Sequence, residues 1–226
     1  MRLSSRTHPH ILFDLDGTLA DTLGDFEHVL NAMLRDRSRA PIALSLLRGV
    51  VTGGTDRMVE AAFGVTPGHR EHAALREEFL SLYATHLSRH TQLFPGIPEV
   101  LDALDRDERR WGIVTNKHER FTSRVIEALA LGARAACVVS GDTVPAPKPD
   151  PSGLQAAAAK LDVPAERCVY IGDARTDVEA AHRAGMKSVV ALFGYIPHGE
   201  DPSQWNADAF VEAPEHLFSV LDLLDD

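Results

Sequence analysis

The sequence has no long apolar run, few cysteines and no excess of positive charge, and each absence excludes a class of protein. No apolar stretch reaches the length of a membrane span, and the first residues, MRLSSRTHPH, lack the apolar segment of a secretory signal. We therefore expect a cytoplasmic location and no membrane partner. The two cysteines, Cys137 and Cys168, lack the C-x-x-C spacing of a metal or redox site.

The charge balance is acidic, with 33 Asp and Glu residues against 23 Lys and Arg and a formal net charge of −10. Nucleic acids and anionic membranes are bound through basic faces, so neither is an expected partner. An anionic substrate must then be met by a few local cations. The composition is that of an ordinary globular chain and allows a monomer or a dimer.

Six short apolar runs rich in valine and isoleucine predict strands, and helical patterns lie between them. Most runs are apolar at consecutive positions, which is typical of strands covered on both faces. Two of the helical patterns stop at Gly132 and Gly185. The alternation predicts an α/β fold, a Rossmann-like doubly wound parallel sheet, with ligands beyond the carboxyl ends of the strands. The runs are HILFDLD, WGIVTN, ACVVSGD, CVYIGD, SVVALFG and AFVEA.

A block of helical patterns interrupts this alternation after the first strand. We predict that residues 19–92 form an inserted, all-helical cap domain and that residues 1–18 and 93–226 form the core domain. Pro95 and Gly96 mark the return to the core. The apolar positions of the block that recur at helical spacing are Phe26, Val29, Leu30, Met33, Leu75, Phe79, Leu82 and Tyr83.

Polar side chains follow four of the predicted strands and should meet at one edge of the sheet. They are Asp14, Asp16, Thr115, Asn116, Lys117, Lys148, Asp173 and Asp177. Carboxylates placed together repel one another, so a cation is expected between them. Mg²⁺ prefers oxygen ligands, and Asp14 and Asp173 can supply them.

These residue types fit phosphoryl transfer. Thr115 and backbone N–H groups can hold phosphoryl oxygens, and Lys148 can balance the charge that a metal alone leaves. One carboxylate can attack phosphorus and form an acyl phosphate, while another protonates the leaving oxygen and then activates water.

The motifs DLDGTLADT, VTN, KPDP and GDARTD, in this order, resemble those of the haloacid dehalogenase superfamily, and the resemblance covers nearly the whole chain. It implies that Asp14 is the nucleophile and Asp16 the general acid and base. It further implies that Thr115, Asn116 and Lys148 bind phosphate, with Thr115 and Lys148 also part of the catalytic set.

The same resemblance implies a Mg²⁺ site. Its ligands would be Asp14, Asp173 and the backbone carbonyl of Asp16, with Asp177 in support. From the residues alone, Asp177 can also be an N-terminal helix cap, and the two roles can coexist.

Within this superfamily, missing residues set several chemistries aside. The second acid, Asp16, favours phosphoester chemistry over carbon–halogen cleavage, and residues 19–92 contain no lysine for the Schiff base of phosphonate-cleaving relatives. Sugar phosphomutases carry a histidine shortly after the first motif, where this chain has Phe26. His28 lies close by but is offset, which weakens the mutase interpretation and leaves it open.

The closest general likeness is to phosphoglycolate phosphatases with a helical C1-type cap. A narrower likeness, carried by VVTGGTDRMVEAAFG, WGIVTNKHERF and GYIPHGEDPSQWNADAFVEAPEHL, is to the bacterial N-acetylmuramic acid 6-phosphate phosphatases of cell-wall sugar recycling. We expect a Mg²⁺-dependent phosphomonoesterase that acts through an aspartyl-phosphate on a small-molecule phosphate, with N-acetylmuramic acid 6-phosphate favoured. The alternatives are a 2-phosphoglycolate phosphatase of metabolite repair, a sugar phosphomutase and a catalytically silent phosphate-binding protein.

The cap stretch GVVTGGTDRM holds the candidate specificity residues Gly53, Gly54 and Arg57. The glycines permit close approach or positive φ, and Arg57 can reach an anionic or hydroxyl-rich leaving group. The alternative is a helix-entry turn followed by a solvated arginine. Lys117 and Arg48 have no assigned role, and phosphate contact and solvation both stay open for Lys117.

Overall fold

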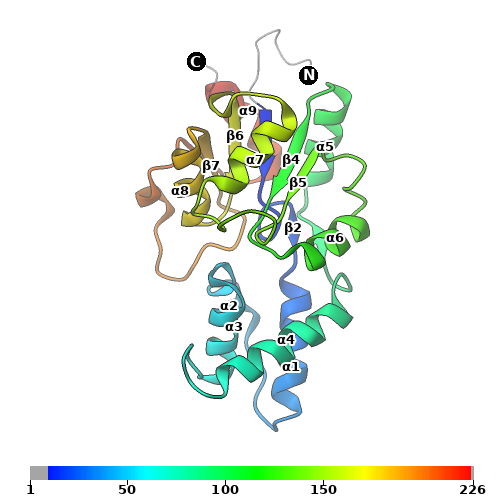
Figure 1. The fold of residues 1–226 in the computed structure, drawn as a ribbon, viewed down its shortest axis with the longest axis vertical. Coiled ribbons are helices and arrows are strands. Elements are labelled where there is room, and N and C mark those ends of the chain that lie inside the picture. Colours follow the sequence, from blue (N-terminus) through cyan, green and yellow to red (C-terminus); the bar gives the residue numbers. More distant parts are fainter. Residues whose placement is uncertain (1–9, 225–226) are drawn as a thin grey trace. The chain divides into compact units, whose positions relative to one another are not determined.

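The computed structural model describes residues 10–224, which divide into an α/β unit and a helical unit (Figure 1). The helical unit comprises Asp21–Gln92 and Tyr195–Glu200, and the α/β unit comprises the rest. The predicted cap, residues 19–92, does not include the second of these segments. Residues 1–9 and 225–226, which the predicted core domain includes, lie outside the described residues.

The α/β unit is built on a parallel sheet of six strands in the order β5-β4-β1-β6-β7-β8 (Figure 1). The six predicted runs supply these strands, so the predicted fold class is confirmed. The strands are β1 (His10–Phe13), β4 (Trp111–Val114), β5 (Cys137–Val139), β6 (Cys168–Gly172), β7 (Lys187–Ala191) and β8 (Ala209–Val211). A two-stranded sheet of β2 (Ala20–Asp21) and β3 (Gln92–Leu93) forms where the chain passes between the units.

Helices connect the strands of the α/β unit. They are α5 (Ile97–Arg106), α6 (Glu119–Ala128), α7 (Ser152–Leu161), α8 (Arg175–Ala184) and α9 (Leu217–Leu224), with 3₁₀ turns at Ala165–Arg167, Pro202–Trp205 and Pro214–His216. The α8 helix ends as predicted at Gly185, whose φ of 76° is left-handed. The α6 helix ends before the predicted Gly132, because Ala130 already takes a positive φ of 55°.

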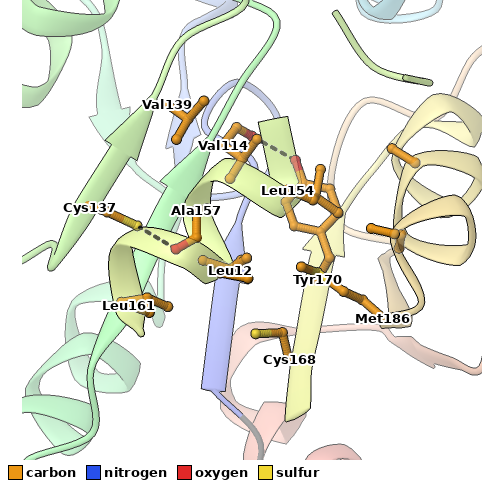
Figure 2. Close-up of a cluster of buried hydrophobic side chains, with 14 residues drawn as sticks. Leu12, Val114, Cys137, Val139, Leu154, Ala157, Leu161, Cys168, Tyr170 and Met186 are labelled. Carbon is orange, nitrogen blue, oxygen red and sulfur yellow. Dashed lines mark hydrogen bonds between the residues drawn. The ribbon is translucent and has the colours of Figure 1, made fainter. Parts of the chain in front are cut away.

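One face of the sheet is covered by α7 and α8. The α7 helix packs against β4 and β5, α8 packs against β6 and β7, and the two helices contact each other. Figure 2 shows the apolar cluster beneath them, with Leu12 of β1 and Tyr170 of β6 near Leu154 of α7. Because side chains alternate along a strand, Phe13 and Trp111 lie on the opposite face, where their rings meet edge to face at 6.0 Å.

The strand register positions the site. Phe13 of β1 pairs with Ile113 of β4 and with Ile171 of β6, so the three strands end at one level. Asp14 follows directly, and Thr115 and Asp173 each come one residue later on their own strands. The sheet therefore brings a carboxylate, a hydroxyl and a second carboxylate to one edge.

The helical unit is formed by four helices with an aromatic core. The helices are α1 (Leu23–Arg35), α2 (Leu44–Arg48), α3 (Gly54–Phe63) and α4 (His72–His86), and a 3₁₀ turn at Val51–Gly53 precedes α3. The Phe26 ring lies 6.3 Å from that of Phe79 and 4.9 Å from that of Tyr83. Within residues 10–224, no helix has both the length and the apolarity required to cross a membrane.

The segment Tyr195–Glu200 follows β7 in sequence and is bound inside the helical unit. The Tyr195 hydroxyl accepts the backbone N–H of Thr22 at 2.8 Å, and the His198 N–H donates to the Gly49 carbonyl at 3.2 Å. The sequence pattern around residues 195–200 contains no helix and so gave no reason to separate it from the core.

Candidate active site

The end of β1 fixes the first carboxylate. The Asp14 N–H donates to the Ile171 carbonyl at 2.8 Å, which continues the sheet by one residue. Its carboxylate oxygen Oδ1 accepts the Leu15 N–H at 2.8 Å and lies 3.0 Å from the Lys148 ammonium. Gly17, at a φ of 85°, provides the tight turn that follows.

Lys148 is buried at the centre of the site. Its Nζ lies 3.0 Å from Asp14 Oδ1, 2.7 Å from Asp177 Oδ1 and 2.6 Å from the Tyr170 hydroxyl. Burial by itself lowers the pKa of Lys148, but the two carboxylates outweigh it and raise the pKa above its ordinary value. The lysine therefore stays charged and holds two carboxylates at once.

Asp14 is the group whose ionisation the site disfavours. Burial raises its pKa to about 7, Lys148 opposes this shift, and the charges of Asp177 and Asp16 add to it. A single ammonium thus does not neutralise the carboxylates around it.

Asp177 joins the start of α8 to Lys148. Its oxygen Oδ2 accepts the N–H groups of Asp173 and Ala174 at 3.1 and 3.0 Å, while Oδ1 faces the lysine. The carboxylate packs so closely on Gly172 that a Cβ there would collide with it. Asp177 therefore caps the start of α8 and also contacts Lys148 in the charged cluster.

The donor set fits a hard divalent cation. Asp14, Asp173 and Asp177 are buried, and each offers an oxygen within 4.8 Å of the others. When all groups are ionised, three carboxylates and the Lys148 ammonium leave two negative charges. Buried like charges are costly unless a cation compensates them, and oxygen ligands are those of Mg²⁺.

Two residues that follow β4, Thr115 and Asn116, have different contacts. The Thr115 hydroxyl oxygen accepts the Lys117 N–H at 3.2 Å, so its own proton is available to a ligand. Both ends of the Asn116 amide bind the Lys148 backbone: Oδ1 accepts its N–H at 2.8 Å and Nδ2 donates to its carbonyl at 3.0 Å. The phosphate-binding role of Asn116 stays a prediction, and its side chain positions the loop that carries Lys148.

Lys117 and Tyr170 are two site residues to which sequence reasoning gave no role. Lys117 Nζ lies 3.0 and 3.1 Å from the two carboxylate oxygens of Asp16, with only 6% of the lysine side chain exposed. In the structure β4 lies next to β1 and so brings Lys117 beside Asp16, but the strand order was not predicted from the sequence. For Tyr170 the signal was a polar ring in a strand otherwise fully apolar.

The predicted cap residues lie in the helical unit. Gly54 takes a positive φ of 73° at the start of α3, and a Cβ on Gly53 would collide with the Arg57 side chain. Arg57 pairs with Glu60 at 2.6 Å and is 59% exposed. Arg48 lies over the Tyr195 ring, 5.3 Å from its centroid. Gly53 and Gly54 therefore form a turn at the entry to α3. Substrate contact by Gly53, Gly54 and Arg57 stays a prediction.

Comparison with known proteins places this geometry in a family. A family model described as haloacid dehalogenase-like hydrolase matches residues 11–191. The chain belongs to the haloacid dehalogenase-like hydrolases. The resemblance seen in the four motifs is thereby confirmed.

Two relatives of this hydrolase are similar over most of its length. An N-acetylmuramic acid 6-phosphate phosphatase of Pseudomonas aeruginosa is 38% identical, with 94% of each chain covered. A phosphoglycolate phosphatase of Xylella fastidiosa is 42% identical, with 97% of this chain and 96% of the relative covered. The predicted enzyme class, a hydrolase acting on phosphoric monoesters, is confirmed by these relatives.

The fold of the hydrolase recurs in solved structures. A predicted phosphoglycolate phosphatase from Haemophilus somnus superposes with a TM-score of 0.83 at 23% identity, covering 96% of this chain and 99% of that one. At this identity the likeness concerns the fold.

Proposed function

We propose that the protein is a Mg²⁺-dependent phosphomonoesterase that forms an aspartyl-phosphate on Asp14. The observation that carries the proposal is the buried cluster of three carboxylates, Asp14, Asp173 and Asp177, the first and last of which contact Lys148. When all of its groups are ionised, this cluster carries a net charge of −2, and it lies beside a hydroxyl with a free proton, Thr115. A cation and a phosphoryl group complete such a site better than any neutral ligand.

In the first half-reaction, Asp14 attacks phosphorus and the P–O bond to the leaving group breaks. The Leu15 N–H and Lys148 both bind Oδ1 of Asp14, and we expect the other oxygen, Oδ2, to attack. The Thr115 hydroxyl donates to a phosphoryl oxygen, and Asp16 delivers a proton to the leaving oxygen.

In the second half-reaction, water attacks the phosphorus of the aspartyl-phosphate and Asp16 accepts the proton from that water. Lys117 holds both oxygens of Asp16 and so fixes the direction in which the carboxylate faces. The products are inorganic phosphate and the free Asp14 carboxylate, which restores the starting state.

Mg²⁺ would be held by Asp14, Asp173 and the backbone carbonyl of Asp16. Asp177 supports this site through its contacts with Lys148 and with the Asp173 N–H. When bound, Mg²⁺ supplies positive charge that stabilises the phosphoryl oxygens.

Among small phosphate monoesters, we favour N-acetylmuramic acid 6-phosphate, with 2-phosphoglycolate as the second candidate. A relative named for each substrate is similar over almost the full chain, which supports both. Each molecule carries a carboxylate besides its phosphate, and they differ mainly in the bulk of the sugar. We propose that Gly53, Gly54 and Arg57 distinguish them, because Arg57 offers an exposed guanidinium next to a glycine turn.

The test is phosphate release from both compounds with Mg²⁺, compared as kcat/KM, with Asp14→Asn as the control for contaminating phosphatase. We expect at least a tenfold preference for the amino sugar phosphate. The opposite preference would transfer the assignment to 2-phosphoglycolate. Activity of the Asp14→Asn variant equal to that of the wild type would refute the aspartyl-phosphate mechanism itself.

The same assay separates the two remaining alternatives. A phosphomutase would move phosphate within a sugar without releasing it. Phe26, which stands at the position of the mutase histidine, packs against Phe79 and Tyr83 and has no group for proton transfer. A silent phosphate-binding protein would release no phosphate, yet Asp14 and Asp16 are both intact.

A further inference from the structure

Tyr170 joins two parts of the site from within the core. Its hydroxyl accepts a hydrogen bond from Lys148 Nζ at 2.6 Å and donates one to the Val114 carbonyl at 2.6 Å. Figure 2 shows this second bond, with the ring beside Leu154 and the hydroxyl directed at Val114. Val114 is the residue before Thr115, so one hydroxyl contacts both the charged lysine and the strand that carries the predicted phosphate binder.

The hydroxyl is not required for packing. Tyr170 is 1% exposed and lies in the apolar cluster with Leu12 and Leu154, where the ring alone would fill the same space. A phenol buried in such a place needs partners for its polar tip, and it finds a cation and a carbonyl. Burial raises the pKa of Tyr170 well above its ordinary value, so the hydroxyl keeps the proton that it donates.

The three protons of the Lys148 ammonium have three close acceptors: the carboxylates of Asp14 and Asp177, and the Tyr170 oxygen. The Val114 carbonyl lies farther from Nζ, at 3.4 Å. With the backbone of Lys148 bracketed by Asn116, Tyr170 is the contact that opposes the pull of the two carboxylates on the amine.

We propose that Tyr170 is a positioning residue for phosphoryl transfer, which holds the Lys148 amine between Asp14 and Asp177 and ties it to the end of β4. The proposal rests on the proposed function of Lys148. Tyr170 does not touch the reacting atoms and acts through the lysine.

The first test needs no activity. The chain has lysines at positions 117, 148, 160 and 187, so a sample labelled with ¹⁵N in lysine gives few side-chain signals. The Lys148 Nζ signal is assigned as the one absent from Lys148→Met. Tyr170→Phe should shift this signal or abolish it by faster exchange with water, while the exposed Lys160 and Lys187 signals stay in place. An unchanged Lys148 signal would overturn the proposal.

The second test is a double-mutant cycle on turnover. Tyr170→Phe should lower kcat about tenfold or more with less than a twofold change in KM, because an acceptor of a charged donor is lost. The same substitution in a Lys148→Met background should change kcat less than twofold. Equal losses in both backgrounds would show that the hydroxyl acts independently of Lys148 and would overturn the proposal.

Tyr83→Phe is the matched control, because Tyr83 is another buried tyrosine and lies in the helical unit. It should leave the Lys148 signal and kcat unchanged. A wild-type chain that releases no phosphate would contradict the proposed function, whereas the ¹⁵N measurement would still decide whether Tyr170 holds Lys148. Should Tyr170→Phe fold poorly, both tests can be repeated with Tyr170→Met, which also lacks the hydroxyl.

Discussion

The α/β unit and the helical unit each bury carboxylates, but they surround them differently. In the helical unit, Asp25 is 0% exposed and accepts the N–H groups of Ser88, Arg89 and His90 and the Thr91 hydroxyl. In the α/β unit, buried carboxylates face one another and share Lys148.

The difference separates a carboxylate that the protein itself satisfies from the carboxylates of the proposed site. Four neutral donors around Asp25 replace the water that its carboxylate loses on burial. The carboxylate thereby holds residues 88–91, which follow α4, in place. At the strand ends, burial and the charges of Asp177 and Asp16 raise the pKa of Asp14 to about 7, although Lys148 opposes the shift. Such unfavourable charge is expected where a ligand completes the site.

The largest effect is expected for Asp14→Asn. Turnover should fall by about 10⁴-fold or more, because the amide cannot form the acyl phosphate. In EDTA at pH 8 the variant should nevertheless resist urea at least as well as the wild type, since one of the repelling charges is gone. A large loss of stability would mean that Asp14 resembles Asp25 and would remove the contrast between the two units.

Asp25→Asn should show the opposite pattern. The amide NH₂ would face backbone N–H donors, and we expect the free energy of unfolding to fall by about 3–4 kcal/mol, measured by urea denaturation. The kcat per folded molecule should stay within about twofold of the wild type. Asp36→Asn, an exposed carboxylate at the end of α1, is the control and should change stability by less than about 0.5 kcal/mol.

The sheet and the carboxylate cluster were predictable from local patterns. Six short apolar runs that end in small or polar residues predict parallel strands, and parallel strands gather their carboxyl ends at one edge. Asp14, Thr115 and Asp173 therefore meet because of strand register, which the sequence order already implies.

Side-chain partners within that edge were not predictable in the same way. The bracket between Asn116 and the Lys148 backbone joins residues 32 positions apart through a loop, and no periodicity encodes a loop path. The pairing of Lys117 with Asp16 depends on a rotamer choice among several acids. Likewise, Tyr195–Glu200 joins the helical unit through contacts that follow no pattern of secondary structure.

Lys117→Met extends the comparison of carboxylates to the α/β unit itself. Asp16 pairs with Lys117, whereas Asp14 shares Lys148 with Asp177. We expect kcat to fall about 10- to 100-fold, since the carboxylate loses the group that binds both its oxygens. Lys117→Arg should recover part of the loss. Lys160→Met removes an exposed lysine and should leave kcat unchanged. Wild-type turnover in Lys117→Met would show that Asp16 is oriented without this contact.

The smallest expected effect is on the pH dependence of Mg²⁺ binding. The raised pKa of Asp14 means that the folded, metal-free protein holds a proton there up to about pH 7, so its stability falls as pH rises from about 4 to 7. A cation must displace that proton. Below pH 7, each unit by which the pH falls should therefore weaken Mg²⁺ affinity about tenfold, and above pH 7 the affinity should be constant.

Calorimetric titrations in buffers of different ionisation enthalpy would count the released proton. Asp14→Asn should abolish this release. An affinity that is constant from pH 6 to 8 would show that Asp14 is already ionised before the cation binds. The cluster would then be as well compensated as Asp25, and its role would have to be sought in structure alone.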